Sequence, residues 1–322
     1  MRKEARYSLP TLIGPSVLIL AMLACSIPGQ NQPTAESTAT HIPPAATVMA
    51  SPTISSLTTP PPTPIPASAV ASPTIPPAAA KGPYAVILVP SGDVLNVRQE
   101  PNSDSAIIDR LQPDAKEIMR TGKYAQTDDQ RWAEIQTPAG GTGWVNIHYL
   151  TEAVPPAKFC NDPRVNLLLD RLVEAMNRQD GELFASLVSP AHGLSLTYLR
   201  TGNTANYSVE EARWLFKSTY VTNWGTHPAS GQEVKATFRD EVLPQLLEVL
   251  SGGFARGCNE LLLGASNYIF EWPFEYRHIN FYSLHKPGST GVELDWRTWL
   301  VGVEYVDGQP YLFALIHLFW EP

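Results

Sequence analysis

Leu95-Asn96-Val97-Arg98 is the stretch that decides the fold of the first folded region, and Gly143-Trp144-Val145 later in the chain supports the same interpretation. Apolar and polar side chains alternate in the first stretch, and successive residues of a strand point to opposite faces of a sheet. We therefore expect a strand with Leu95 and Val97 in the core. The glycine before Trp144 allows a tight turn and leaves room for the large ring, because glycine has no Cβ.

Residues 84–150 break into short apolar runs that are separated by turn residues such as Ser91-Gly92-Asp93 and Ala139-Gly140-Gly141. Runs bounded by Gly, Pro, Asn, Asp and Ser are typical of strands joined by tight turns. The sequence therefore predicts a small all-β barrel. The expected strands cover residues 85–89, 94–98, 106–111, 117–121, 132–137 and 143–147.

This segment resembles the bacterial SH3 domain family. The resemblance is carried by the two stretches above together with Pro101, Trp132 and Tyr149-Leu150. Where the family often has Ser-Gly before the proline, this chain has Gln99-Glu100, which leaves the shape of the first loop open. Members commonly occur on exported proteins, where they bind cell-wall peptides or act as targeting modules. The resemblance implies an SH3-like barrel over residues 83–152, with cell-wall peptidoglycan or its peptides as the partner.

The candidate ligand contacts of this module are polar and aromatic side chains: Asn96, Arg98, Tyr124, Trp132, Trp144 and Tyr149. The tryptophan rings have an alternative, structural role, because rings beside so small a core usually pack into it. Arg98 has the alternative role of tying loops together.

The N-terminus has the features of a secretory signal peptide over residues 1–24. Arg2, Lys3 and Arg6 precede an apolar run over residues 12–24. A helix that spans a bilayer needs roughly 20 apolar residues, so this run is too short.

Met22-Leu23-Ala24-Cys25 ends the run and resembles a bacterial lipobox, with Met22 in place of the usual leucine. The resemblance implies cleavage before Cys25, lipidation of that cysteine and a membrane anchor on the outer, extracytoplasmic face. The alternatives, a simple cleaved signal or an uncleaved anchor, also export the protein.

Residues 25–82 are rich in Pro, Thr, Ser and Ala, with Pro60-Pro61-Pro62-Thr63-Pro64 at the centre. The segment has no apolar periodicity, so it cannot bury enough apolar surface to fold. We expect a disordered tether; a role as a proline-rich ligand is the alternative.

The formal net charge of the 322 residues is −8. Removal of residues 1–24 takes away three positive charges and one negative charge, so the mature chain carries −8 − 2 = −10. Such an acidic chain argues against nucleic acid as a partner.

Residues 157–322 read as a second, α+β domain. Asp162 and Pro163 are start signals for a helix whose apolar residues recur at helical spacing, and Ser208 with Glu211 forms a capping box. A further helix is expected over residues 241–250, and long strands are expected over residues 276–284, 296–306 and 311–320. Asp307-Gly308 indicates that the last two strands form a hairpin. The residues around 175–180 resemble the nuclear-transport-factor-2-like cone fold.

Cys160 and Cys258 are the only cysteines besides Cys25, and an isolated pair in an exported protein indicates a disulfide. The alternative is a cysteine nucleophile with a histidine base, but the flanking motifs of wall peptidases are missing. The histidines lack the spacing of a zinc site. The sequence therefore predicts no catalytic residue, no metal and no cofactor.

Trp272, Tyr276, Trp296 and Trp299 are the candidate lining of a ligand-binding cup in the second domain. Core packing is the alternative use of these rings. The sequence as a whole favours a lipid-anchored, non-enzymatic cell-envelope protein that binds peptidoglycan, with a possible protein partner for its second domain. Two alternatives stay open: a wall hydrolase targeted by the SH3-like module, and a structural or assembly lipoprotein.

Overall fold

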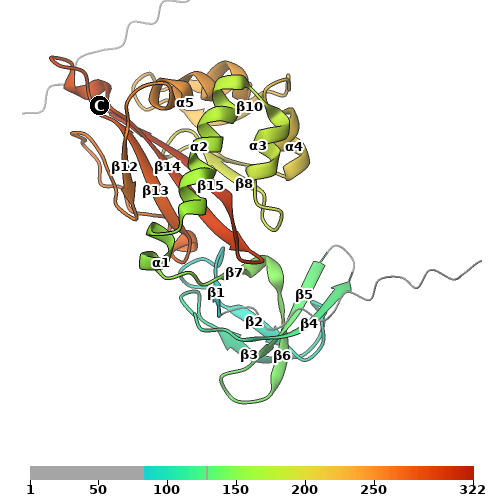
Figure 1. Ribbon diagram of the computed structural model, residues 1–322. Coiled ribbons are helices and arrows are strands. Elements are labelled where there is room, and N and C mark those ends of the chain that lie inside the picture. Colours follow the sequence, from blue (N-terminus) through green and yellow to red (C-terminus); the bar gives the residue numbers. More distant parts are fainter. Residues whose placement is uncertain (1–82, 128–129) are drawn as a thin grey trace, which may run out of the picture. The chain divides into compact units, whose positions relative to one another are not determined.

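The computed structural model describes residues 83–127 and 130–322 (Figure 1). The predicted signal peptide, Cys25 and the predicted tether lie outside the described residues. Among the helices that are described, none combines the length and the apolar character that a crossing of the bilayer requires.

The first folded region, which we call the module, is all-β, as predicted. Five of its strands form one sheet in the order β3-β2-β6-β5-β4, while β1 and β7 pair in a second sheet, and neither sheet is closed. The strands are β1 (Tyr84–Val86), β2 (Leu95–Arg98), β3 (Ile107–Leu111), β4 (Arg120–Thr127), β5 (Gln130–Gln136), β6 (Thr142–Asn146) and β7 (Leu150–Glu152).

Strand β2 has the predicted alternation, because Leu95 and Val97 are buried while Asn96 and Arg98 are half-buried. Gly143 lies inside β6 rather than in a turn, and a Cβ there would come within 2.5 Å of Val97 Cγ1. The glycine before Trp144 is therefore needed for the close approach of β6 to β2.

Two predicted strand boundaries of the module are wrong for one physical reason. Leu88 and Glu117 both have a positive φ, 59° and 61°, which no strand accommodates. The first strand consequently ends at Val86 instead of residue 89, and β4 begins at Arg120 instead of residue 117.

The second folded region, which we call the C-terminal domain, combines helices with a six-stranded sheet in the order β12-β13-β14-β15-β8-β9. Its neighbours are antiparallel except for β15 and β8, which run parallel. The helices are α1 (Pro156–Cys160), α2 (Pro163–Arg178), α3 (Gly181–Leu187), α4 (Val209–Trp214) and α5 (Leu243–Leu250). The sheet strands are β8 (Leu194–Thr197), β9 (Thr204–Tyr207), β12 (Ala255–Cys258), β13 (Asn280–Lys286), β14 (Arg297–Val306) and β15 (Gln309–Phe319), and a separate pair is formed by β10 (Thr222–Thr226) and β11 (Glu233–Ala236). The likeness to the nuclear-transport-factor-2-like fold stays a prediction.

Helix α2 begins where the sequence predicts. The carboxylate of Asp162 accepts a hydrogen bond from the Arg164 N–H (2.9 Å), and Pro163 occupies the first turn. The helix ends at Arg178 and is capped by Gln179, whose backbone is left-handed with φ 51°.

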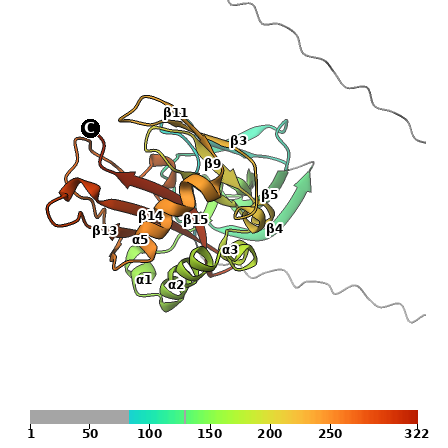
Figure 2. The same ribbon diagram turned by 90° about the horizontal axis from the view of Figure 1, so that it is seen from above.

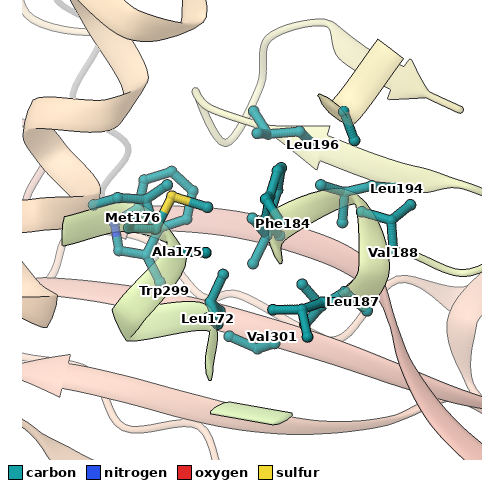
Figure 3. Packing of buried hydrophobic residues seen from close by; sticks show 14 of the residues in the cluster. Leu172, Ala175, Met176, Phe184, Leu187, Val188, Leu194, Leu196, Trp299 and Val301 are labelled. Carbon is teal, nitrogen blue, oxygen red and sulfur yellow. The ribbon is translucent and has the colours of Figure 1, made fainter. Parts of the chain in front are cut away.

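Helices α2 and α5 cover one face of the sheet (Figures 1 and 2). Side chains from α2, α3, β8 and β14 meet there in the main core, which includes Leu172, Met176, Phe184 and Trp299 (Figure 3). The hairpin of β14 and β15 turns at Asp307 and Gly308, which both have a positive φ, as the sequence predicts.

A disulfide joins Cys160 at the end of α1 to Cys258 on β12, as predicted, with the Cα atoms 5.8 Å apart.

The module and the C-terminal domain share a buried apolar cluster, in which Ile87 packs with Ile279, Phe313 and Ala314. Polar contacts surround it. The Leu88 N–H donates to the carbonyl of Glu275 (2.9 Å), and the His192 ring contacts both the Glu304 carboxylate (2.7 Å) and the carbonyl of His148 (3.0 Å). Residues 83–322 therefore contain one continuous packed unit across the boundary between the two regions.

Candidate functional site

A cavity of about 310 Å³ opens on the module, and we call it the module pocket. Its wall comes from the loop before β2, from β2 itself, from β5 and β6, and from the turn before β7. The lining residues are Leu88, Val89, Pro90, Asp93, Val94, Leu95, Asn96, Arg98, Ser103, Gln130, Trp132, Asn146 and Tyr149.

Four of the six predicted contacts meet in this pocket, namely Asn96, Arg98, Trp132 and Tyr149. Asn96 and Arg98 are brought there by the alternation of β2, which sends them away from the core. The Arg98 guanidinium also donates to the carbonyl of Ser105 (2.7 Å). Arg98 therefore lines the pocket and ties down the neighbouring loop at the same time.

Trp132 lines the pocket, and its indole nitrogen is a buried polar atom. Its side chain is only 3% exposed, and its Nε1–H has no hydrogen-bond partner in the described part of the protein. A buried N–H that stays unpaired costs roughly 1–3 kcal/mol, and an indole nitrogen can only donate. An acceptor oxygen that reached this nitrogen would remove the cost.

Among the described residues that line the pocket, Asp93 carries a negative charge and Arg98 a positive one. Asn96, Gln130 and Asn146 add amide groups, which can both donate and accept hydrogen bonds. Such a lining suits a ligand that presents N–H and C=O groups together with charged ends of either sign.

Tyr124 and Trp144 do not line the module pocket. Tyr124 is 48% exposed, and the guanidinium of Arg120 lies 4.2 Å from its ring centroid. Trp144 stands in β6 opposite Glu134 on one side and Arg98 on the other.

Asp93 and Asn146 line the pocket although the sequence analysis did not single them out. A signal for Asn146 was present, because the period of two in β6 places Val145 in the core and Asn146 on the other face. Asp93 stands in the turn directly before β2, where the sequence gives no indication of which way the loop folds.

The positive φ of Leu88 shapes one wall of the module pocket, and the contact with the C-terminal domain supports it. Leu88 lines the pocket, and its N–H is held by the carbonyl of Glu275. The C-terminal domain therefore helps to position the module pocket.

The structure brings Trp272, Tyr276 and Trp296 into one apolar cluster and places Trp299 in the main core. Trp296 and Trp299 are fully buried in separate clusters, and their Nε1–H groups donate to the carbonyls of Ala265 (2.8 Å) and Gln245 (3.3 Å). Their spacing of three residues sends them to opposite faces of the sheet. Within the cluster of Trp296, Trp272 stacks on Phe281 (ring centroids 4.4 Å apart) and donates to the carbonyl of Tyr276 (2.8 Å).

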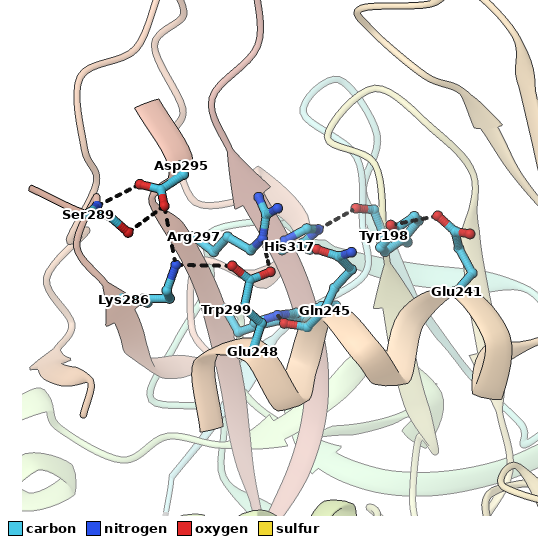
Figure 4. Close-up of polar contacts among 10 residues, drawn as sticks. All are labelled: Tyr198, Glu241, Gln245, Glu248, Lys286, Ser289, Asp295, Arg297, Trp299 and His317. Carbon is cyan, nitrogen blue, oxygen red and sulfur yellow. Dashed lines mark hydrogen bonds and ion pairs between the residues drawn. The ribbon is translucent and has the colours of Figure 1, made fainter. Parts of the chain in front are cut away.

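His317 is the most strongly perturbed histidine of the C-terminal domain. Its buried ring stacks on Trp299 (centroids 4.5 Å) and on Tyr198 (5.4 Å), as Figure 4 shows with the polar groups around it. Its Nδ1 donates to the carbonyl of Tyr198 (3.2 Å). Burial lowers the pKa of His317 to about 3, so the ring is neutral at neutral pH. His317 does not line the module pocket, and its surroundings are those of a core residue.

Comparison with known proteins agrees with the geometry of the module. Residues 93–151 match the family model of the bacterial SH3 domain, a family often involved in cell-wall binding. No curated protein and no solved structure matches the chain.

Proposed function

We propose that this chain is an exported, lipid-anchored protein of the cell envelope whose module binds the peptides of peptidoglycan in the module pocket. The convergence of Asn96, Arg98, Trp132 and Tyr149 in one pocket is the observation that carries the proposal, and ten of the thirteen lining residues fall within the family match.

The chemistry of the pocket fits a short peptide. Peptide backbones supply the carbonyl oxygen that Trp132 lacks and the N–H groups that the asparagine side chains accept. Wall peptides also carry free carboxylates and amino groups, which Arg98 and Asp93 complement. A volume of about 310 Å³ is at the small end of ligand pockets, so it suits a few residues rather than a folded partner.

The anchor and the tether belong to the same proposal. Lipidation of Cys25 would hold the chain at the outer face of the membrane, and residues 25–82 would let the module reach the wall. The lipobox-like residues and the proline-rich composition support this part of the proposal.

The test is co-sedimentation of residues 26–322 with purified peptidoglycan. Trp132→Phe removes the unpaired N–H, and Trp144→Phe makes the same change outside the pocket. We expect saturable pelleting of the unmodified chain and of Trp144→Phe, with binding about tenfold weaker for Trp132→Phe, the loss of one buried hydrogen bond.

Each other result has a defined meaning. Equal binding of the two variants would refute the role of the module pocket. Absence of pelleting would refute wall binding and favour a structural or assembly lipoprotein. A cleared zone in a gel that contains wall material would instead favour a targeted hydrolase.

A further inference from the structure

A second and larger cavity, of about 570 Å³, lies in the C-terminal domain between β9, α4 and β10. We call it the α4 pocket. It is formed by residues far from the module pocket in sequence, and no motif predicts it. Three aromatic side chains line the pocket, namely Tyr207, Trp214 and Tyr220, together with short polar residues.

Two of these rings are unusually exposed for their size. Trp214 is 52% exposed and Tyr220 is 74% exposed. Rings of this kind normally bury most of their surface, so a large apolar area at the α4 pocket is left in contact with water.

The exposed Trp214 ring is held in place rather than left to rotate. Its Nε1–H donates to the carboxylate of Glu210 (3.0 Å), one turn earlier in α4. The helix itself begins with a complete capping box formed by Ser208 and Glu211. A fixed aromatic ring at a cavity gives a stacking surface with little entropy to lose on binding.

The polar part of the lining favours a neutral ligand. Asn206, Ser218, Thr222 and Asn223 contribute amides and hydroxyls, and no Lys or Arg belongs to the lining. The carboxylate of Glu211 is already bonded to the N–H and the hydroxyl of Ser208. The nearest cation that the structure describes at these rings is the Lys217 ammonium, 6.0 Å from the Trp214 ring centroid and outside the lining.

We propose that the α4 pocket binds the sugar rings of a glycan that contains N-acetylated hexosamines. Pyranose rings have an apolar C–H face, which stacks on aromatic rings such as Trp214 and Tyr220, and polar edges, which hydrogen-bond to amides and hydroxyls. Acetamido groups match the asparagine amides as both donors and acceptors. The inference depends on the proposed envelope function only for where the glycan comes from. The α4 pocket and the module pocket are separate, so sugar binding does not require peptide binding.

The test is titration of residues 26–322 with a soluble hexamer of N-acetylglucosamine, followed by calorimetry. Trp214→Ala and Tyr220→Ala remove the stacking surfaces, and we expect each to weaken binding about tenfold. Tyr220→Phe keeps the ring and is expected to bind like the unmodified chain. Ile269→Ala, at a residue that is 89% exposed and outside the pocket, is the control for a surface truncation.

Circular dichroism of each variant checks that the fold is kept. Trp132→Phe is titrated in parallel and should leave sugar binding unchanged, which separates this inference from the proposal for the module pocket. No binding of the hexamer at millimolar concentration would overturn the inference. Equal affinity of Trp214→Ala and the unmodified chain for the hexamer would also overturn it. So would tighter binding of a proline-rich peptide with the sequence of residues 58–66 than of the hexamer.

Discussion

Acid should destabilise the C-terminal domain through His317, and the variant His317→Asn should remove much of this effect. The folded chain keeps the His317 ring neutral, because burial lowers its pKa from 6.5 to about 3. The unfolded chain binds the proton near pH 6.5. Below that pH the unfolded state therefore holds more protons than the folded state, so stability is lost as the pH falls from 6.5 towards 3.

The size of the effect follows from the same two pKa values. Between pH 7 and pH 5 the unfolded state gains about three quarters of a proton at this position while the folded state gains almost none. One pKa unit corresponds to about 1.4 kcal/mol, so the loss over this interval is about 2 kcal/mol. The result is insensitive to the folded value, because any folded pKa well below 5 gives the same difference.

Urea unfolding of residues 26–322 at pH 5, 6 and 7, at constant ionic strength and with the disulfide intact, measures this loss. Asn at position 317 keeps a side-chain N–H near Nδ1 for the carbonyl of Tyr198 but does not titrate. Burial also lowers the pKa values of His148, His278 and His285, yet these contribute equally to both proteins. If the two proteins lost stability in parallel between pH 7 and pH 5, the argument about His317 would be refuted.

Three further predictions concern the disulfide and the contact between the module and the C-terminal domain. Replacement of both Cys160 and Cys258 by Ser should lower the free energy of unfolding by up to about 4.7 kcal/mol, because the closed loop spans 98 residues; an unchanged melting temperature would contradict this. Glu304→Gln replaces the carboxylate that bonds to the buried His192 ring at 2.7 Å by an amide, and we expect a loss of about 1–3 kcal/mol, seen as faster hydrogen exchange at Leu88; exchange at the unmodified rate would contradict it. Phe313→Ala should cost about 3–5 kcal/mol in urea unfolding, since the ring is fully buried in the shared cluster; a cost below 1 kcal/mol would show that the cluster contributes little.

Local patterns predicted the elements whose structure is decided by neighbouring residues. The alternation in β2, the cap of α2 at Asp162 and the turn at Asp307-Gly308 are all visible in a few consecutive side chains. The pairing of Cys160 with Cys258 followed from the count of cysteines alone. These features need no knowledge of the rest of the chain.

The errors arise where tertiary contacts override the local pattern. Leu88 has the side chain of a strand residue, but its positive φ points its N–H to Glu275, a partner far away in the sequence. Trp296 and Trp299 are close in the sequence but belong to different clusters, because the sheet separates them. The α4 pocket was missed although its lining lies between Ala205 and Asn223, because the path of the chain between β9, α4 and β10 is not visible in their local patterns.

The contact between the two folded regions changes how the module must be studied. The family match suggests that the module could be produced as a separate fragment, which would end near residue 152. It would expose Ile87, which is buried against Phe313, and it would release the Leu88 N–H from Glu275. Because Leu88 is part of the wall of the module pocket, the pocket of the fragment would differ from that of the intact chain. If such a fragment failed to bind peptidoglycan, the failure could be explained by the lost contacts with the C-terminal domain. Whether the module pocket binds the wall must therefore be decided with residues 26–322 and the variants Trp132→Phe and Trp144→Phe.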